Sequence, residues 1–309
     1  MRRIWILVLL SLVGAVAWMA GGCSKTSTGN STLAPLDTTT TAFLANNVSQ
    51  PIIDQTGQDA VGTIELVGMI PVAGAPHPAG VPASLGPGHM TWDTVAHSYA
   101  GGWHVFYFAL HRTDTTYRDT HMVMVNQQVT GYDSVRIWSQ GQPVQFRGAA
   151  DSLESRIHAQ GTAVNSENDS ASGVRHRVMR VSGDPWVNPI TTLTFNGSSN
   201  DTLGGTFHPR ALAVCTFNNT YAGSVNNVII DSATLYADGC PPSGSMSFTA
   251  HVSAGCTGLT DTVSFNGTWT ISVTYNHGIE TKSFSNGLAQ AVRVDTCGVR
   301  PVASPFSLH

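Results

Sequence analysis

The chain has 309 residues and a formal net charge of −4, with 15 Lys and Arg residues against 19 Asp and Glu residues. This acidic balance argues against a nucleic-acid partner, because proteins that bind nucleic acid usually carry a basic patch for the phosphates. Charged residues make up only 11% of the chain and there are 31 glycines. Ordinary soluble domains are about 25% charged, so the composition favours a turn-rich β protein.

The N-terminal residues are typical of a secretion signal. Two arginines precede an apolar run over 4–19, and the small residues 20–22 lead into Cys23. The run is shorter than the roughly 20 apolar residues that favour a spanning helix. Residues 20–23 resemble the lipobox of bacterial lipoproteins, in which the cysteine is lipidated and becomes the mature N-terminus. The resemblance implies a signal peptide over 1–22, a membrane anchor at Cys23 and, because Ser24 follows, sorting to the outer membrane. An ordinary signal peptide or an uncleaved anchor is the alternative.

The next segment, 23–41, is predicted to be a lipidated N-terminus followed by a flexible tether. It consists mostly of Ser, Thr, Gly and Asn and ends in four consecutive threonines. Such a composition buries too little apolar surface to offset the entropy lost on ordering. The alternative is a short helix over 37–49, which Asp37 would cap and which would carry Leu44 and Val48.

The remainder, 42–309, is predicted to be all-β, because apolar and polar residues alternate with a period of two in many short runs. Sequential strands of this kind form an antiparallel meander or a β-sandwich-like domain. The region is either one domain or two subdomains, 42–190 and 191–309. The expected strands are 64–70, 103–110, 121–129, 134–138, 153–164, 174–181, 191–195, 203–207, 211–217, 228–236, 245–252 and 263–275.

The clearest strand is 263–275, in which seven apolar or small residues face one way and Ser, Thr and Asn face the other. A turn at 276–278 would fold the chain back on this strand. The fold-back would place Trp269 opposite Phe284, which is a favourable cross-strand pair.

Four cysteines remain besides Cys23, an even number that suits disulfides in an exported protein. The same fold-back would place Cys256 opposite Cys297, which predicts that pair. By exclusion the second pair is Cys215 with Cys240, which brackets a possible turn at 226–227. Reduced cysteines are the alternative if the compartment is not oxidising.

Histidines are concentrated in one segment, since six of the 12 lie between 77 and 121 together with several methionines. Imidazole suits zinc, and imidazole with thioether suits copper. The weak candidate ligands are His89, His97, His111 and His121. None of them has the close spacing of a metal motif, so strand and loop histidines without a metal are favoured, and no cofactor is predicted.

Arginines form a second cluster, interleaved with acidic residues. If strands 153–164 and 174–181 pair, their polar side chains would form a charged face able to bind an anion. The favoured interpretation is nevertheless a solvated face whose ion pairs contribute at most about 1 kcal/mol each. Tryptophans would stack on sugars if exposed, but a β core also uses tryptophan; the residues are Trp92, Trp103, Trp138, Trp186 and Trp269. The arginines are Arg136, Arg147, Arg156, Arg175, Arg177 and Arg180.

No short catalytic motif such as a nucleophile elbow, a P-loop or a zincin helix is present. The sequence therefore favours a lipid-anchored cell-envelope protein with a structural, binding or assembly role. A carrier of an apolar or anionic ligand is the alternative. A hydrolase of envelope polymers would need two converging acidic residues. The residues to inspect for it are Asp151, Glu154, Asp231 and Asp238.

Overall fold

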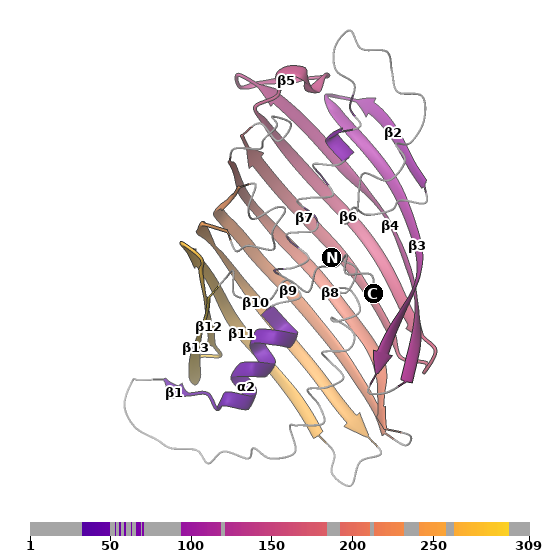
Figure 1. Ribbon diagram of the computed structural model, residues 1–309, viewed down its shortest axis with the longest axis vertical. Coiled ribbons are helices and arrows are strands. Elements are labelled where there is room, and N and C mark those ends of the chain that lie inside the picture. The colour runs from indigo at the N-terminus through magenta and orange to yellow at the C-terminus, as the bar shows by residue number, and fades with distance from the viewer. Residues whose placement is uncertain are drawn as a thin grey trace, which may run out of the picture.

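The computed structural model describes most of the strands and part of the N-terminal region. The described residues are 33–49, 53, 56, 59, 63, 66–68, 70, 94–118, 121–183, 192–210, 213–231, 241–257 and 263–296. All of the described strands belong to one 13-stranded sheet (Figure 1). The prediction of a β meander is confirmed in part, because the described structure is mostly β and its one sheet is mostly, but not wholly, antiparallel. The described strands do not form the second layer that a sandwich requires.

The strands follow one another along the chain, each pairing antiparallel with the next. The exceptions are β5, which folds back onto β4, and β1, which runs parallel to β13. β7 and β8 pair over almost their whole lengths, so the sheet continues across the suggested division at 190/191. The bounds are β1 (Ala34–Pro35), β2 (Thr94–Ala100), β3 (Trp103–Arg118), β4 (His121–Ser139), β5 (Gln142–Val144), β6 (Ser152–Asn165), β7 (Ser170–Ser182), β8 (Leu193–Arg210), β9 (Ala213–Ile230), β10 (Ser243–Thr257), β11 (Val263–Asn276), β12 (Ile279–Ser285) and β13 (Ala289–Thr296).

Several strands are much longer than the usual five or six residues. β4 has 19 residues and β8 and β9 have 18 each. Each of these three strands includes residues that were predicted from the sequence to separate two shorter strands. The turn predicted at 226–227 is instead a bulge inside β9, where Asn227 adopts a φ of 48° and its backbone N–H donates to the side chain of Asn196 at 2.9 Å. A bulge of this kind absorbs an extra residue without ending the strand.

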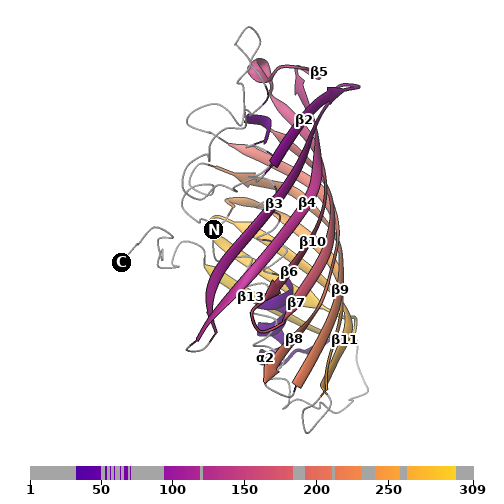
Figure 2. The same ribbon diagram turned by 90° about the vertical axis from the view of Figure 1, so that its right-hand side faces the viewer.

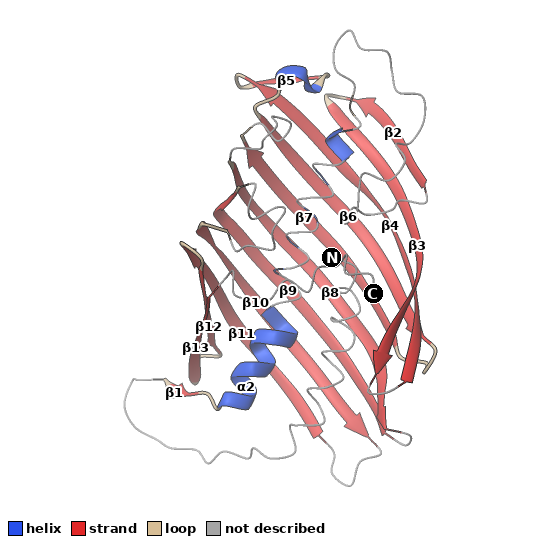
Figure 3. Ribbon diagram, viewed as in Figure 1, coloured by secondary structure: helices blue, strands red, loops and turns tan. Residues whose placement is uncertain are grey.

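The sheet is a single curved layer, and α2 (Thr38–Phe43) lies on its concave side (Figures 1 and 2). We call this side the covered face and the convex side the open face. Among the described residues, helices are few compared with strands (Figure 3). Successive side chains alternate between the faces, so on β6 Leu153 and Ile157 lie on the covered face and Arg156 lies on the open face.

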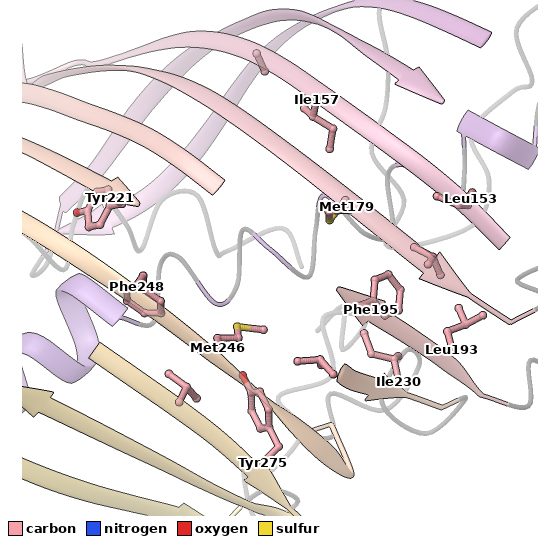
Figure 4. Close-up of a cluster of buried hydrophobic side chains, with 14 of the residues drawn as sticks. Leu153, Ile157, Met179, Leu193, Phe195, Tyr221, Ile230, Met246, Phe248 and Tyr275 are labelled. Carbon is pink, nitrogen blue, oxygen red and sulfur yellow. The ribbon is translucent and has the colours of Figure 1, made fainter. Parts of the chain in front are cut away.

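The hydrophobic core lies against the covered face (Figure 4). Strand residues such as Phe195, Phe248 and Ile271 form one buried cluster with N-terminal residues such as Leu44 and Leu66. The chain therefore covers the concave side of its sheet with its own N-terminal region.

That N-terminal region is helical over 38–49 and at the described residues between 53 and 68. Asp37 caps α2 by accepting a hydrogen bond from the Thr40 backbone N–H at 2.8 Å, and a π-helix (Leu44–Ser49) follows. The helix considered for 37–49 is confirmed, so 38–41 are not part of a tether. The strand predicted over 64–70 is wrong, because 66–68 are helical. Among the described residues, no helix has the length and apolar character needed to cross a membrane. The signal and the anchor, 1–23, lie outside them.

The predicted turn after β11 is confirmed, since His277 and Gly278 connect β11 to β12 with φ angles of 47° and 83°. Asn276 pairs with Ile279, which places Phe284 opposite Ile271 and not opposite Trp269. β12 ends at Ser285, where the chain turns again into β13. β13 pairs with β12 and not with β11, so the predicted fold-back of 289–296 along β11 is wrong.

The structure contains a disulfide between Cys215 and Cys256. β9 and β10 place these residues directly opposite each other, with a Cα–Cα distance of 4.0 Å. The predicted pairs, Cys256 with Cys297 and Cys215 with Cys240, are therefore both wrong. Cys240 and Cys297 lie outside the described residues.

Candidate binding surface

Aromatic and arginine side chains gather on the open face of β3, β4, β6 and β7. The register places Arg136 on β4 opposite Glu154 on β6, and Glu154 opposite Arg180 on β7. We define the aromatic–arginine patch as Trp103, Arg136, Trp138, Glu154, Arg156 and Arg180.

Two guanidinium groups of the patch stack on tryptophan rings. The Cζ of Arg136 lies 4.2 Å from the ring centroid of Trp103 and 5.7 Å from that of Trp138. The Cζ of Arg156 lies 4.5 Å from the Trp103 centroid. Cation–π contacts of this kind contribute roughly 0.5–1 kcal/mol at exposed sites. They favour positions of the guanidinium groups over the tryptophan rings.

Glu154 is the acidic member of the patch, and two arginines share it. Arg156 donates from Nε and Nη2 to Oε1 at 3.0 and 2.8 Å, and Nη2 of Arg180 lies 3.3 Å from Oε2. The side chain of Glu154 is mostly buried, whereas the side chains of Arg156 and Arg180 are 57% and 73% exposed. Three arginines against one glutamate make the patch cationic in an acidic protein. Guanidinium groups with free donors favour carboxylate or phosphate ligands.

A row of four rings lies beside the patch on the same face, one from each of β3, β4, β6 and β7. We call Tyr107, Tyr132, His158 and His176 the tyrosine–histidine row. Successive ring centroids are separated by 6.1, 5.3 and 4.3 Å. Tyr107 and Tyr132 are 54% and 40% exposed. The row therefore extends the aromatic surface across the four strands.

The open face changes character further along the sheet. On β9, β10 and β11 the described open-face residues include no Asp, Glu, Lys or Arg. They are mainly Ser, Thr and Asn, as in the series Thr268, Thr270, Ser272 and Thr274 on β11. The open face of these three strands therefore lacks the charged side chains that the patch on β3, β4, β6 and β7 provides.

Buried charges on the covered face connect the N-terminal region to the sheet. The guanidinium of Arg177 lies 2.9 Å from Asp59 and 2.7 Å from Asp201, and it donates to the Thr56 hydroxyl at 3.0 Å. Arg175 lies 2.6 Å from Asp59. Arg177 and both aspartates are less than a tenth exposed. The group is enclosed, so it fastens the helical residues 56 and 59 to β7 and β8.

A second buried group lies on the same face. Ser155 and Thr63 donate hydrogen bonds to Asp133 at 2.7 and 2.9 Å. Burial raises the pKa of Asp133 to about 6, and nearby Asp59 adds to this, although the two hydroxyl donors lower it. The helical residue Thr63 is thereby fixed to β4 and β6.

The four candidate metal ligands do not converge where they are described. His97 on β2 bonds to His104, while His111 lies on the open face of β3 and His121 begins β4. His89 lies outside the described residues. Burial and the neighbouring His97 lower the pKa of His104 to about 4. Within the described ranges, no group of three or more His, Cys, Asp or Glu side chains is arranged for a metal.

The arginine cluster was predicted only in part. The pairing of strands 153–164 and 174–181 is confirmed by β6 and β7. Alternation then divides the cluster, because Arg136, Arg156 and Arg180 lie on the open face, whereas Arg177 has the same parity as the buried Met179. This alternation is visible in the sequence, so it could have been used to predict which arginines are buried. The remaining members are Arg175 on the covered face and Arg147 in a 3₁₀ turn (Arg147–Ala149).

The acidic residues considered for hydrolysis do not form a converging catalytic pair where they are described. Glu154 is held by two arginines. Asp151 accepts from the Gln140 backbone N–H at 2.7 Å and from Ser152 at 2.8 Å, which lowers its pKa. Asp231 follows β9, and Asp238 lies outside the described residues.

No protein-family model, curated protein or solved structure matches the chain. Its function is therefore inferred from its own geometry.

Proposed function

We propose that the protein is a cell-envelope lipoprotein, anchored through Cys23 to the outer membrane, that binds an anionic glycan on the open face of its sheet. The observation that carries the proposal is the aromatic–arginine patch, in which guanidinium groups are held on tryptophan rings beside an exposed tyrosine–histidine row. The residues before Cys23 support the anchor.

The chemistry of the patch suits a charged sugar polymer. Aromatic side chains offer apolar faces with polar edges, on which sugar rings stack. Arginines supply paired donors for carboxylate groups. Both components extend across four neighbouring strands, which suits a polymer better than a small compact ligand. The covered face has less room, because residues of the same chain pack into its core.

The ligand class is tested by titrating the purified protein with three polymers. Polygalacturonate carries sugar rings and carboxylates, dextran carries sugar rings alone, and polyphosphate carries negative charge alone. We expect polygalacturonate to bind most tightly, with an affinity that falls as salt rises. Equal binding to polyphosphate would indicate a simple anion site. Failure to bind polygalacturonate would contradict the proposal.

The anchor is tested by Cys23→Ser. Lipidation requires the thiol, so the variant should appear in the soluble envelope fraction as a folded protein with its Cys215–Cys256 disulfide intact. The wild-type protein should remain with the outer membrane. A variant that stays in the membrane fraction would contradict anchoring through Cys23.

A second candidate function, a ligand carrier, is favoured by a groove between the N-terminal region and the last strand. The groove has a volume of about 620 Å³ and lies between β1, α2 and β13. Leu33, Leu36, Ala291 and Val292 line much of it. Volumes of about 300–1,000 Å³ suit small ligands. A carrier should bind an apolar fluorescent probe here, and Val292→Trp should displace it. Equal probe binding by this variant would exclude the groove.

A further inference from the structure

Two histidines of the tyrosine–histidine row face each other across β6 and β7. His158 and His176 are register partners, and their Nδ1 atoms lie 2.9 Å apart. Their ring centroids are 4.3 Å apart and the ring planes are tilted by 52°. The pair lies on the exposed side of the sheet, where His176 is open to solvent.

The second histidine pair shows what a direct hydrogen bond between imidazoles looks like in this protein. His97 Nε2 and His104 Nδ1 are 3.0 Å apart, the centroids are 5.3 Å apart and the rings are within 13° of parallel. A ring centre lies about 1.2 Å behind its nitrogen, so an in-plane N–H···N bond of this length separates the centroids by about 5.4 Å. His97 and His104 fit that geometry.

His158 and His176 are also within hydrogen-bond distance, but their rings are not in line with the bond, because their centroids are 1.0 Å closer at almost the same nitrogen separation. Two imidazoles that bind one ion, with bonds of about 2.05 Å and an N–metal–N angle of about 90°, have nitrogens about 2.9 Å apart and centroids about 4.6 Å apart. A tetrahedral angle of about 109° would separate the nitrogens by about 3.3 Å. The observed pair is nearer to the 90° arrangement.

We propose that His158 and His176 form a two-histidine site for a divalent transition metal that prefers cis, square-planar coordination, which is Cu²⁺ or Ni²⁺. Imidazole suits both ions, and Cu²⁺ is the stronger binder in the Irving–Williams order. The exposed position leaves the other coordination sites to water or to a donor on a bound partner. This site goes beyond glycan binding and does not depend on it.

The neighbouring cationic side chain is turned away from the pair. Arg156 precedes His158 by two residues on the same face, and its guanidinium bonds to Glu154 and stacks on Trp103. Glu154 lies on the opposite side of Arg156 from His158 along β6. Tyr132 stacks on the His158 ring with centroids 5.3 Å apart and planes 25° apart, which limits rotation of that imidazole.

The experiment is a titration of the purified full chain with CuSO₄ alone, followed by equilibrium dialysis and the electron paramagnetic resonance spectrum of Cu²⁺. The variant is His176→Ala, and the matched control is His251→Ala. His251 also lies on the open face, where it bonds to the Thr268 hydroxyl at 2.7 Å. It has no histidine opposite it on β9 or β11.

We expect the wild-type protein and His251→Ala to bind one Cu²⁺ at this site with a spectrum of two coordinated nitrogens. His176→Ala should bind it about 10–100-fold more weakly and lose one of the two nitrogens. Zn²⁺ should bind more weakly than Cu²⁺. Equal copper affinity in His176→Ala, or an identical spectrum, would overturn the proposal. So would failure of the wild-type protein to retain copper at micromolar concentration, with circular dichroism used to confirm that each variant is folded.

Discussion

Arginines on the two faces of β7 lie in opposite environments. Arg177 is buried on the covered face between Asp59 and Asp201, whereas Arg180, three residues later, projects from the open face with 73% of its side chain exposed. The first arginine fastens a helical segment to the sheet. The second one adds positive charge to a surface. Strand parity, and not residue type, therefore separates structural charges from those available for binding.

The comparison explains why the open face is the better candidate for function. On the covered face, hydrogen bonds and ion pairs satisfy the polar groups of residues 56, 59 and 63. A ligand there would have to displace part of the chain. On the open face the side chains of Arg156 and Arg180 are more than half exposed to solvent.

The largest expected effect comes from Arg177→Ala. The substitution leaves Asp201 and part of Asp59 buried without their cation, which typically costs about 3–5 kcal/mol. Arg180→Ala is the matched control on the same strand and should cost less than about 1 kcal/mol, because the ion pair is exposed. Denaturant unfolding of the two variants measures the difference. Similar losses in both would show that the faces do not differ as described.

The disulfide should have the next largest effect. The Cys215–Cys256 bridge closes a 41-residue separation between β9 and β10. Replacing both cysteines with serine should lower the free energy of unfolding by about 4 kcal/mol in the chain-entropy model. Peptide mapping without reduction checks the linkage itself. Recovery of a Cys256–Cys297 peptide would contradict the observed register of β9 and β10.

Asp133, which is buried on the covered face, should make the free energy of unfolding depend on pH. Its pKa is about 6 in the folded protein against an ordinary value of 3.8, so the native state holds the proton more tightly. The resulting stabilisation is fully present below pH 3.8 and is lost as the pH rises through 6, a change of about 3 kcal/mol.

Asp133→Asn removes this titration while keeping an acceptor for Ser155 and Thr63. The difference in unfolding free energy between variant and wild type should shift by roughly 2 kcal/mol in favour of the variant between pH 4 and pH 7. Unfolding curves at several pH values test this. A constant difference would mean that Asp133 titrates normally.

The smallest effect on stability is expected from Arg156→Gln on the open face. Arg156 is 57% exposed and shares Glu154 with Arg180, so the loss should be below about 1 kcal/mol. Thermal unfolding is the measurement. A loss of several kcal/mol would show that the patch is a structural element of the sheet.

The sequence predicted the parts of the fold that depend on local alternation. Strand 263–275 and the turn after it were found, because a period of two and a turn at His277–Gly278 are visible in the residues themselves. The lengths of the strands were not predicted correctly. Residues such as Asn196 and Asn227 favour turns locally, but in the structure they lie in bulges that neighbouring strands support. The run 64–70 was assigned to a strand because short apolar runs look alike in buried helices and strands.

The aromatic–arginine patch could also be predicted only in part from the sequence. The arginine cluster marked the correct strands, and parity would have divided it into two faces. The partner of Arg177 was not predictable, because Asp59 is more than a hundred residues away in the sequence and only tertiary packing brings it to β7. The disulfide prediction failed for the same reason, since it considered only the fold-back after β11, whereas β10 also pairs with β9 and places Cys256 opposite Cys215.

The most direct test of the central claim is the affinity for polygalacturonate of the double variant Arg156→Gln, Arg180→Gln, measured by isothermal titration calorimetry. The control is Arg293→Gln, which removes an arginine from β13 at the far end of the sheet. Binding on the open face predicts at least about a tenfold loss in the double variant, since each charged hydrogen bond contributes roughly 1.5–3 kcal/mol, and no change in the control. Unchanged affinity in the double variant would contradict the account.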